Sequence, residues 1–370
     1  MSMKGEREPL LAALLDPAGT AALSPRVWND LLLRARGNGL LARLGVQLVD
    51  RGLHERIPAK ARAQMRAACI AAESSQTAVR FEINRLLRAL GKQDTPVILL
   101  KGAAYMMAGL PPARGRLIGD LDLMVPRERI NSVEQTLVAK GWVPADMDDY
   151  DQHYYREWAH EIPPLQHPER ETALDIHHTI VPLTSRVRPD ADALLAASVP
   201  LADHRLRVLG PPDMVLHSAV HLFNDEVGRP LRDLFDLHDL LCHFGTRDDF
   251  WMELIDRARL HGLERPCYYM LRYTKRILRT PIAPHCQNAA AAWAPSPMLL
   301  GLMDWIFEQR FMPESPETPR RGAAFARWLY YVRTHWLRMP PLLLVRHLTI
   351  KAARRVRERW RRDSAVTENV

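Results

Sequence analysis

The sequence predicts an α+β protein in which an α/β core is flanked by N-terminal and C-terminal helical regions. After Pro58, the residues up to 90 contain many Ala and Arg and no Gly or Pro, which favours one long helix ending at Gly91. Short apolar runs then alternate with stretches of helical spacing over residues 91–210, which is the pattern of an α/β core. From Pro211 onward the apolar residues return to helical spacing.

The chain has 370 residues, which is too long for one small core. We therefore expect four segments along it. They are an N-terminal helical region over 1–90, the α/β core over 91–210, a C-terminal helical domain over 211–312, and a Pro-rich loop with basic helices and a tail over 313–370.

Local signals predict the individual elements. Ser24 followed by Pro25 is typical of a helix start. Short apolar or alternating stretches predict strands at 97–100, 120–125, 153–158, 173–181 and 205–209. Helical spacing predicts helices at 103–109, 130–141, 214–223, 231–244, 250–261 and 267–278.

The composition is that of an ordinary globular protein, with 47% hydrophobic and 25% charged residues. The apolar run from Leu10 to Leu15 is too short for a secretory signal, and no stretch approaches the roughly 20 apolar residues of a membrane span. The four cysteines show no CxxC spacing, which argues against a zinc site built on them. We expect a cytoplasmic protein, either free or peripheral to the inner membrane, and its net charge of +8 favours anionic partners.

The strongest functional signal is the stretch Gly-Asp-Leu-Asp-Leu-Met-Val at 119–125. Residues two apart in a strand point to the same face, so Asp120 and Asp122 are expected side by side. Two neighbouring carboxylates repel each other unless a cation lies between them. Hard oxygen ligands of this kind suit Mg²⁺ or Mn²⁺, so the pair predicts a metal platform for phosphoryl or nucleotidyl transfer.

A two-metal site for this chemistry needs a third carboxylate, which must come from a neighbouring strand. The stretch Ala-Leu-Asp-Ile-His at 173–177 fits, because its alternation turns Asp175 and His177 to the face opposite Leu174 and Ile176. We therefore expect Asp175 to complete a catalytic and metal-binding set with Asp120 and Asp122. His177 is expected to contact the substrate or to support the metal ligands.

The ordered stretches at 99–102, 116–125 and 174–177 resemble the uncharacterised bacterial nucleotidyltransferase family of the DNA polymerase β-like superfamily. The family pattern has a Leu-Lys-Gly step, an Arg four residues before an Asp-x-Asp strand, and a later Asp-x-His strand. His217, His221 and the stretch 232–236 resemble its downstream helical segment. The resemblance covers about residues 90–245. It implies a mixed sheet, an NTP substrate with ATP as the first candidate, Mg²⁺, and transfer of a nucleoside monophosphate with release of pyrophosphate.

The resemblance also implies a place for the triphosphate. Many superfamily members use a Gly-Ser step there, whereas this chain has Lys101 and Gly102. Backbone N–H groups at the start of the helix after Gly102 are suited to phosphate, and Lys101 would add a point charge. Arg116 is expected either to contact phosphate or to pair with Asp120 or Asp122. The remaining candidates for a substrate pocket are His177, His221, Arg232 and Asp236.

Several alternatives remain open at this stage. His217 and His221 share a helix face but lack the Glu of an HExxH motif, which favours packing or pocket lining over zinc. Arg232 and Asp236 lie one helical turn apart, a spacing that also suits an ion pair. The acceptor is a small molecule, a saccharide or lipid-linked precursor, a protein side chain or an RNA end. The rival functions are a non-catalytic nucleotide-binding or scaffold protein and an RNA-modifying nucleotidyltransferase.

The C-terminal stretch 342–362 combines an apolar stripe at helical spacing with Lys and Arg on the other faces. Such a helix lies on an anionic membrane surface, contacts nucleic acid phosphates, or covers the protein core with its stripe. The sequence leaves these three alternatives open.

Overall fold

The structure is a computed structural model that describes residues 8–342 except 92, 94, 171, 225–227 and 314–319, together with 344, 345 and 349. In this part of the chain, seven strands form one sheet in the order β3-β4-β5-β2-β1-β7-β6. They are β1 (Val97–Leu99), β2 (Asp120–Met124), β3 (Val143–Pro144), β4 (Leu165–Gln166), β5 (Ala173–His177), β6 (Val199–Pro200) and β7 (Leu206–Val208). Pairs β2–β5 and β1–β7 are parallel and the other pairs are antiparallel. The predicted α+β class with a mixed sheet is confirmed.

The centre of the sheet is apolar on both faces. All three residues of β1 are fully buried, as are Leu121, Leu123 and Met124 of β2. A strand that is buried on both faces needs cover on both, and the helices before and after the sheet supply it. The carboxylates of β2 and β5 are therefore held by a rigid, well-packed frame.

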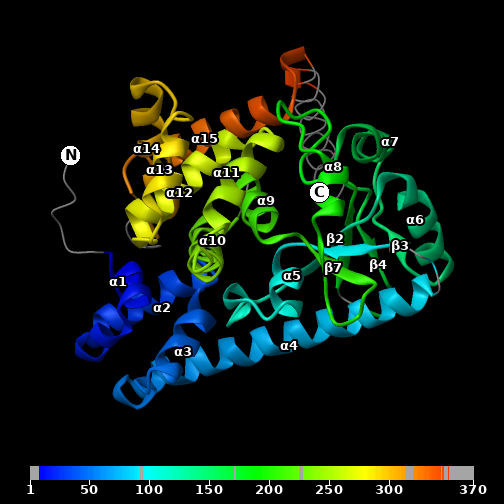
Figure 1. The fold of residues 1–370 in the computed structure, drawn as a ribbon. Helices are drawn as coiled ribbons and strands as arrows, with labels where there is room; N and C mark the ends of the chain where they lie inside the picture. The colour runs from blue at the N-terminus through cyan, green and yellow to red at the C-terminus, as the bar shows by residue number, and fades with distance from the viewer. Residues whose placement is uncertain are drawn as a thin grey trace, which may run out of the picture.

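Helices precede the sheet along the chain, as predicted. They are α1 (Pro9–Leu15), η1 (Pro17–Ala22), α2 (Pro25–Gly37), α3 (Leu41–Asp50), η2 (His54–Arg56) and α4 (Ala59–Leu90). The long helix α4 ends at Gly91, whose φ of 60° is a conformation that favours glycine. Figure 1 shows α4 running along one side of the molecule from α3 towards α6, and it contacts α5 and β2 on the way.

Short helices connect the strands. They are α5 (Lys101–Met107), η3 (Pro111–Ala113), η4 (Arg127–Arg129), α6 (Ile130–Ala139), α7 (Asp149–His153), the π-helix η5 (Tyr154–Trp158) and α8 (Ala191–Ala196). The strand predicted at 153–158 is wrong, because these residues continue α7 as a π-helix. Asp148 caps α7 by accepting a hydrogen bond from the Asp151 amide, and Trp158 packs edge-on against His153 and Tyr154. These helical contacts outweigh the strand preference of the aromatic residues.

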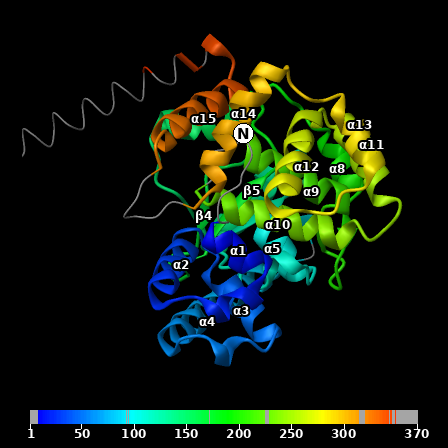
Figure 2. The same cartoon turned by 90° about the vertical axis from the view of Figure 1, so that its left-hand side faces the viewer.

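A helical region follows β7. It consists of α9 (Pro211–Asn224), α10 (Pro230–Phe244), α11 (Phe250–Leu260), α12 (Glu264–Leu278), α13 (Pro284–Ala291), α14 (Pro297–Phe311) and α15 (Ala323–Arg338). The four helices predicted between 214 and 278 are confirmed as α9 to α12. Figure 2 shows α14 and α15 together at one end of the molecule and the N-terminal helices at the other.

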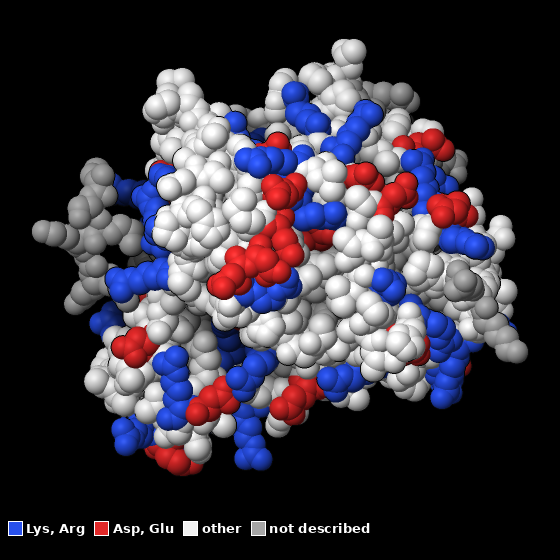
Figure 3. Space-filling view, viewed as in Figure 1, with Lys and Arg blue, Asp and Glu red and all other residues white. Residues whose placement is uncertain are grey.

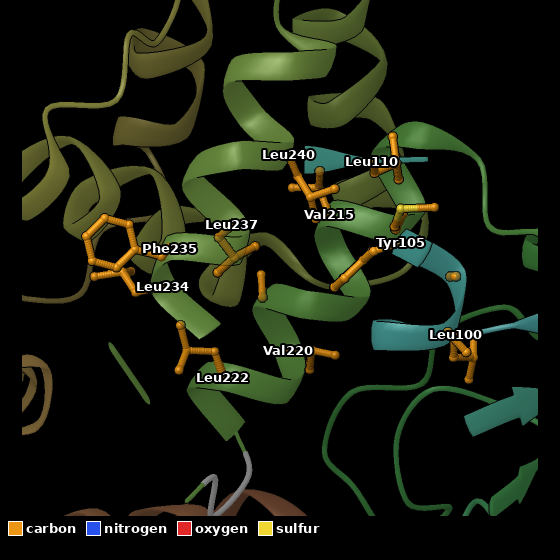
Figure 4. Close-up of a cluster of buried hydrophobic side chains, with 14 of the residues drawn as sticks. Leu100, Tyr105, Leu110, Val215, Val220, Leu222, Leu234, Phe235, Leu237 and Leu240 are labelled. Carbon is orange, nitrogen blue, oxygen red and sulfur yellow. The ribbon is translucent and has the colours of Figure 1, made fainter. Parts of the chain in front are cut away.

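A buried apolar cluster joins the sheet region to the helices that follow it. Figure 4 shows side chains of α9 and α10, among them Val215, Leu237 and Leu240, gathered beside Tyr105 of α5 and Leu110. Burial of this kind contributes roughly 25 cal/mol for each Å² of apolar surface removed from water. It fixes α9 and α10 against α5, and the candidate site lies at this junction.

The surface carries both signs of charge. Figure 3 shows basic and acidic side chains interspersed over one face, with an acidic group near its centre. Among the helices that the structure describes, none combines the length and hydropathy that a membrane crossing requires. Most of the basic stretch 342–362 lies outside the described residues, so the predictions for it remain predictions, as do the four domain boundaries.

Candidate active site

The parallel pairing of β2 with β5 brings two of the three predicted carboxylates together. Asp122 and Asp175 are direct register partners on neighbouring strands. Asp120 is the first residue of β2, opposite Ala173, and is more exposed than the buried Asp122. Each of the two aspartates precedes a buried leucine along β2. This is the alternation that predicted one shared face for Asp120 and Asp122.

Asp122 accepts two hydrogen bonds on the same oxygen. The Nζ of Lys101 donates to Oδ1 over 2.8 Å, and Nε2 of His177 donates to it over 3.1 Å. Burial opposes the charge of Asp122, but Lys101 and His177 outweigh it and hold the pKa of this carboxyl far below its usual range. Asp122 is therefore a buried, ionised carboxylate.

The neighbouring carboxylates behave differently. Burial, followed by the charges of Asp122 and Glu161, raises the pKa of Asp175 to about 7. Partial burial and the charge of Asp122 also raise the pKa of Asp120. Carboxylates that repel one another in this way form a donor set that fits a hard divalent cation such as Mg²⁺.

The three carboxylates nevertheless do not form a closed cage. Among the described residues, the group whose ligand atoms all lie within 4.8 Å of one another is His160, Glu161 and His177, not the aspartates. A cation at the aspartates would therefore need small side-chain movements, and the ammonium of Lys101 already lies against Asp122.

A polar cavity of about 310 Å³ opens beside the aspartates. It lies between β2, α5, α9 and α10. Its lining includes Lys101, Gly102, Tyr105, Arg116, Asp120, Asp122, Ser218, His221, Arg229, Arg232, Asp233 and Asp236. Every predicted site residue except Asp175 and His177 thus lines one cavity, and these two lie next to Asp122.

Arg116 is largely buried and is paired with α10 rather than with β2. Its guanidinium hydrogen-bonds to Asp236 and has Asp233 within 4.0 Å, while Tyr105 packs beneath it at 5.6 Å. Burial and the nearby charge of Arg232 lower its pKa. The sequence left open an ion pair between Arg116 and Asp120 or Asp122. Among the described residues, Arg116 does not form this pair.

The ion pair of Arg232 also differs from the one that its spacing suggested. Its guanidinium donates twice to Oδ1 of Asp233, over 2.9 and 2.7 Å, and not to Asp236 one turn away. The other oxygen of Asp233, Oδ2, is buried and has no hydrogen-bond partner within the described structure. This oxygen is an unsatisfied acceptor beneath the cavity lining.

The backbone at Lys101 and Gly102 is tightly constrained. Lys101 has a φ of 44°, in the left-handed region that lysine rarely adopts, and such a residue costs roughly 1–3 kcal/mol. A Cβ at Gly102 would lie 3.2 Å from Nε of Arg116. Glycine therefore lets α5 approach Arg116, and the strain at Lys101 is the kind that accumulates at functional sites.

Comparison with protein families decides the classification. A family model described as an uncharacterised nucleotidyltransferase matches residues 24–279, more than two thirds of the chain. The chain belongs to this nucleotidyltransferase family. Among curated proteins and among solved structures, no relative matches it. The bacterial origin and the DNA polymerase β-like superfamily inferred from the motifs remain predictions.

In this nucleotidyltransferase, several site residues escaped the sequence-based prediction. Arg229 and Asp233 line the cavity, and Glu161 lies near Asp175. Oε2 of Glu161 is 3.4 Å from Nδ1 of His177. Glu161 stands in a loop and reaches β5 through an isolated bridge to His177, so no strand periodicity pointed to it. Asp233 lay inside the stretch 232–236 that carried the family resemblance.

Proposed function

We propose that this protein is an Mg²⁺-dependent nucleotidyltransferase that transfers a nucleoside monophosphate from an NTP, with ATP as the first candidate, to an acceptor hydroxyl, releasing pyrophosphate. The family match supports nucleotidyl transfer in general. The observation that carries the proposal is the register pairing of Asp122 with Asp175 beside a cavity lined by Lys101 and Arg116. Acidic metal ligands next to basic side chains are what a metal–triphosphate substrate requires.

The metal would be held by Asp120, Asp122 and Asp175. The raised pKa values of Asp120 and Asp175 support this, because a bound cation would offset the repulsion that raises them. A bound Mg²⁺ or Mn²⁺ neutralises phosphate charge and orients the α-phosphate for in-line displacement. The residues fit that role by donor type, and Lys101 would move from Asp122 towards phosphate when the ion binds.

The cavity would bind the rest of the nucleotide. Lys101, Arg229 and Arg232 bring positive charge to one wall, and Arg116 is fixed there by Asp236. Guanidinium groups match phosphate oxygens in geometry as well as charge.

The acceptor would approach from the side of Asp175. This residue does not line the nucleotide cavity, and its carboxylate would take the proton of the acceptor hydroxyl. Donor and acceptor would meet at the aspartates, and positioning would supply much of the rate.

One observation favours a second function, nucleotide binding without catalysis. Lys101 already neutralises Asp122, and the three aspartates are not drawn together as a closed metal cage. A protein that binds nucleotide through the cationic wall alone would be built in the same way.

Calorimetric titration with NTPs, with and without Mg²⁺, separates the two functions. The proposal predicts binding that strengthens with Mg²⁺ in the wild type and loses this dependence in Asp120→Asn/Asp122→Asn. Asp203→Asn is the matched control, because Asp203 is an exposed aspartate before β7. Binding that is indifferent to both Mg²⁺ and the double substitution would favour the non-catalytic function and contradict catalysis.

A further inference from the structure

Two histidines and a glutamate converge beside Asp122, outside the nucleotide cavity. His160, Glu161 and His177 each offer one ligand atom, and these atoms all lie within 4.8 Å of one another. None of the three lines the nucleotide cavity. The rings of His160 and His177 have centroids 5.0 Å apart, so both imidazoles face the same small volume.

The spacing suits a transition metal. Zinc bonds to histidine nitrogen and carboxylate oxygen of about 2.0–2.2 Å place neighbouring ligands of a tetrahedral ion about 3.3–3.5 Å apart. Nδ1 of His177 and Oε2 of Glu161 are already 3.4 Å apart. Imidazole nitrogen favours Zn²⁺ and related ions, whereas Mg²⁺ favours oxygen alone.

The surroundings of His177 fit a metal ligand as well. Its Nε2 donates to Oδ1 of Asp122, which leaves Nδ1 turned towards Glu161. A carboxylate that holds the far nitrogen of a ligating histidine is the usual outer partner of such a site, because it fixes the ring and its tautomer.

The backbone holds the two ligand segments in place. Glu161 and His177 form an antiparallel bridge. The amide of His178 donates to the carbonyl of His160 over 2.9 Å, and the amide of Ile162 donates to the carbonyl of Ile176 over 3.0 Å. The three ligands are therefore presented by paired backbone next to the central strands, which favours a preformed site.

We infer that His160, Glu161 and His177 form a second cation site, selective for Zn²⁺ over Mg²⁺ and separate from the three aspartates. Three protein ligands leave a fourth position for water. The ion would lock His177 and, through it, the orientation of Asp122. The inference does not depend on nucleotidyl transfer, because it concerns metal binding by the isolated protein.

The test is competition for Zn²⁺ between the metal-free, full-length protein and a chromogenic chelator, followed by Co²⁺ absorption to report the coordination. We expect one Zn²⁺ per chain, unaffected by millimolar Mg²⁺. Loss of an outer-shell partner weakens metal binding by about 10–100-fold, so loss of a ligand in His160→Ala or Glu161→Gln should exceed roughly 100-fold. Asp122→Asn removes the outer partner of His177, so it should weaken Zn²⁺ binding by about 10–100-fold.

Two variants serve as controls. His204→Ala removes an exposed histidine before β7, and Asp120→Asn removes a carboxylate of the other site. Both should bind Zn²⁺ like the wild type. Glu161→Gln keeps the shape of the side chain, so it remains informative if His160→Ala does not fold. The inference is overturned if the wild type fails to compete for Zn²⁺, if both ligand variants bind normally, or if Asp120→Asn abolishes binding.

Discussion

The ammonium of Lys101 lies 2.8 Å from Oδ1 of Asp122, where the first residue of α5 meets the middle of β2. Burial disfavours the charged lysine, yet the charge of Asp122 outweighs it and raises the pKa of Lys101 further. Each charge thus stabilises the other in a buried setting. This pair joins the cavity proposed for the nucleotide to the aspartates proposed for the metal, so it links the two halves of the proposed site.

Lys101→Met should destabilise the metal-free protein, because it leaves Asp122 charged, buried and supported by His177 alone. We expect the free energy of unfolding to fall by roughly 1–3 kcal/mol. Millimolar Mg²⁺ should restore part of this loss by supplying the missing positive charge. Denaturant titrations with and without Mg²⁺ measure both effects. Lys101→Arg keeps the charge, so its free energy of unfolding should fall by less. An equal fall in both variants would contradict the pairing of Lys101 with Asp122.

Asp175→Asn should have opposite effects on stability and function. Burial and the nearby carboxylates disfavour the charge of Asp175 in the metal-free protein. Removing that charge should raise the free energy of unfolding by roughly 0.5–2 kcal/mol, as is common when a functional charge is lost. Mg²⁺-dependent NTP binding should weaken in the same variant. If Asp175→Asn is less stable than the wild type in the absence of metal, Asp175 has a structural role instead.

Arg116→Gln should weaken NTP binding by roughly 10–100-fold, which corresponds to about 1.4–2.8 kcal/mol. The substitution removes a guanidinium from the cavity wall and leaves Asp236 without it. Calorimetry with a fixed Mg²⁺ concentration gives the affinity. Arg114→Gln is the matched control, because Arg114 lies on the same connection but is exposed and pairs with Asp50. Equal losses in the two variants would exclude a specific role for Arg116.

Asp304 offers a pH-dependent test of the helical region. Burial opposes its charge, but hydrogen bonds from Arg272 and Tyr273 outweigh burial and lower its pKa. A depressed pKa in the folded state stabilises the protein fully above the unfolded value of about 3.9, and this contribution disappears as the pH falls through the folded pKa. Asp304→Asn should therefore cost roughly 1.5–3 kcal/mol at pH 7.

The difference between wild type and Asp304→Asn should shrink below about pH 4. Urea denaturation at a series of pH values measures it. Asp256→Asn is the control, because Asp256 forms only an exposed pair with Arg259. A difference that stays constant from pH 7 to pH 3 would show that the charge of Asp304 is not what stabilises the contact between α12 and α14.

Local patterns predicted much of the framework. The alternation at 119–125 located β2, the second alternation located β5, and the absence of Gly and Pro after Pro58 located α4. These features depend on residues close in sequence, so periodicity and capping suffice to find them. The aromatic segment 153–158 was misassigned because its contacts within a helix outweighed residue preference.

Long-range partners were beyond such patterns. Arg116 pairs with Asp236, 120 residues away, so only the packing of α10 against the core makes the contact. Glu161 approaches His177 through a bridge formed by a loop, and Arg229 reaches the cavity from the turn before α10. No spacing in the sequence encodes these approaches, because they arise when separate elements pack together.

Following a nucleotide labelled at its α-phosphate tests the central claim most directly. Wild-type protein, Mg²⁺, each of the four labelled NTPs and a cell extract as the source of acceptor should yield labelled acceptor and an equal amount of pyrophosphate. Asp122→Asn, folded as judged by circular dichroism, should yield neither. Transfer of the γ-phosphate in place of the α-phosphate, or transfer of the α-label that persists in Asp122→Asn, would contradict nucleotidyl transfer at these aspartates.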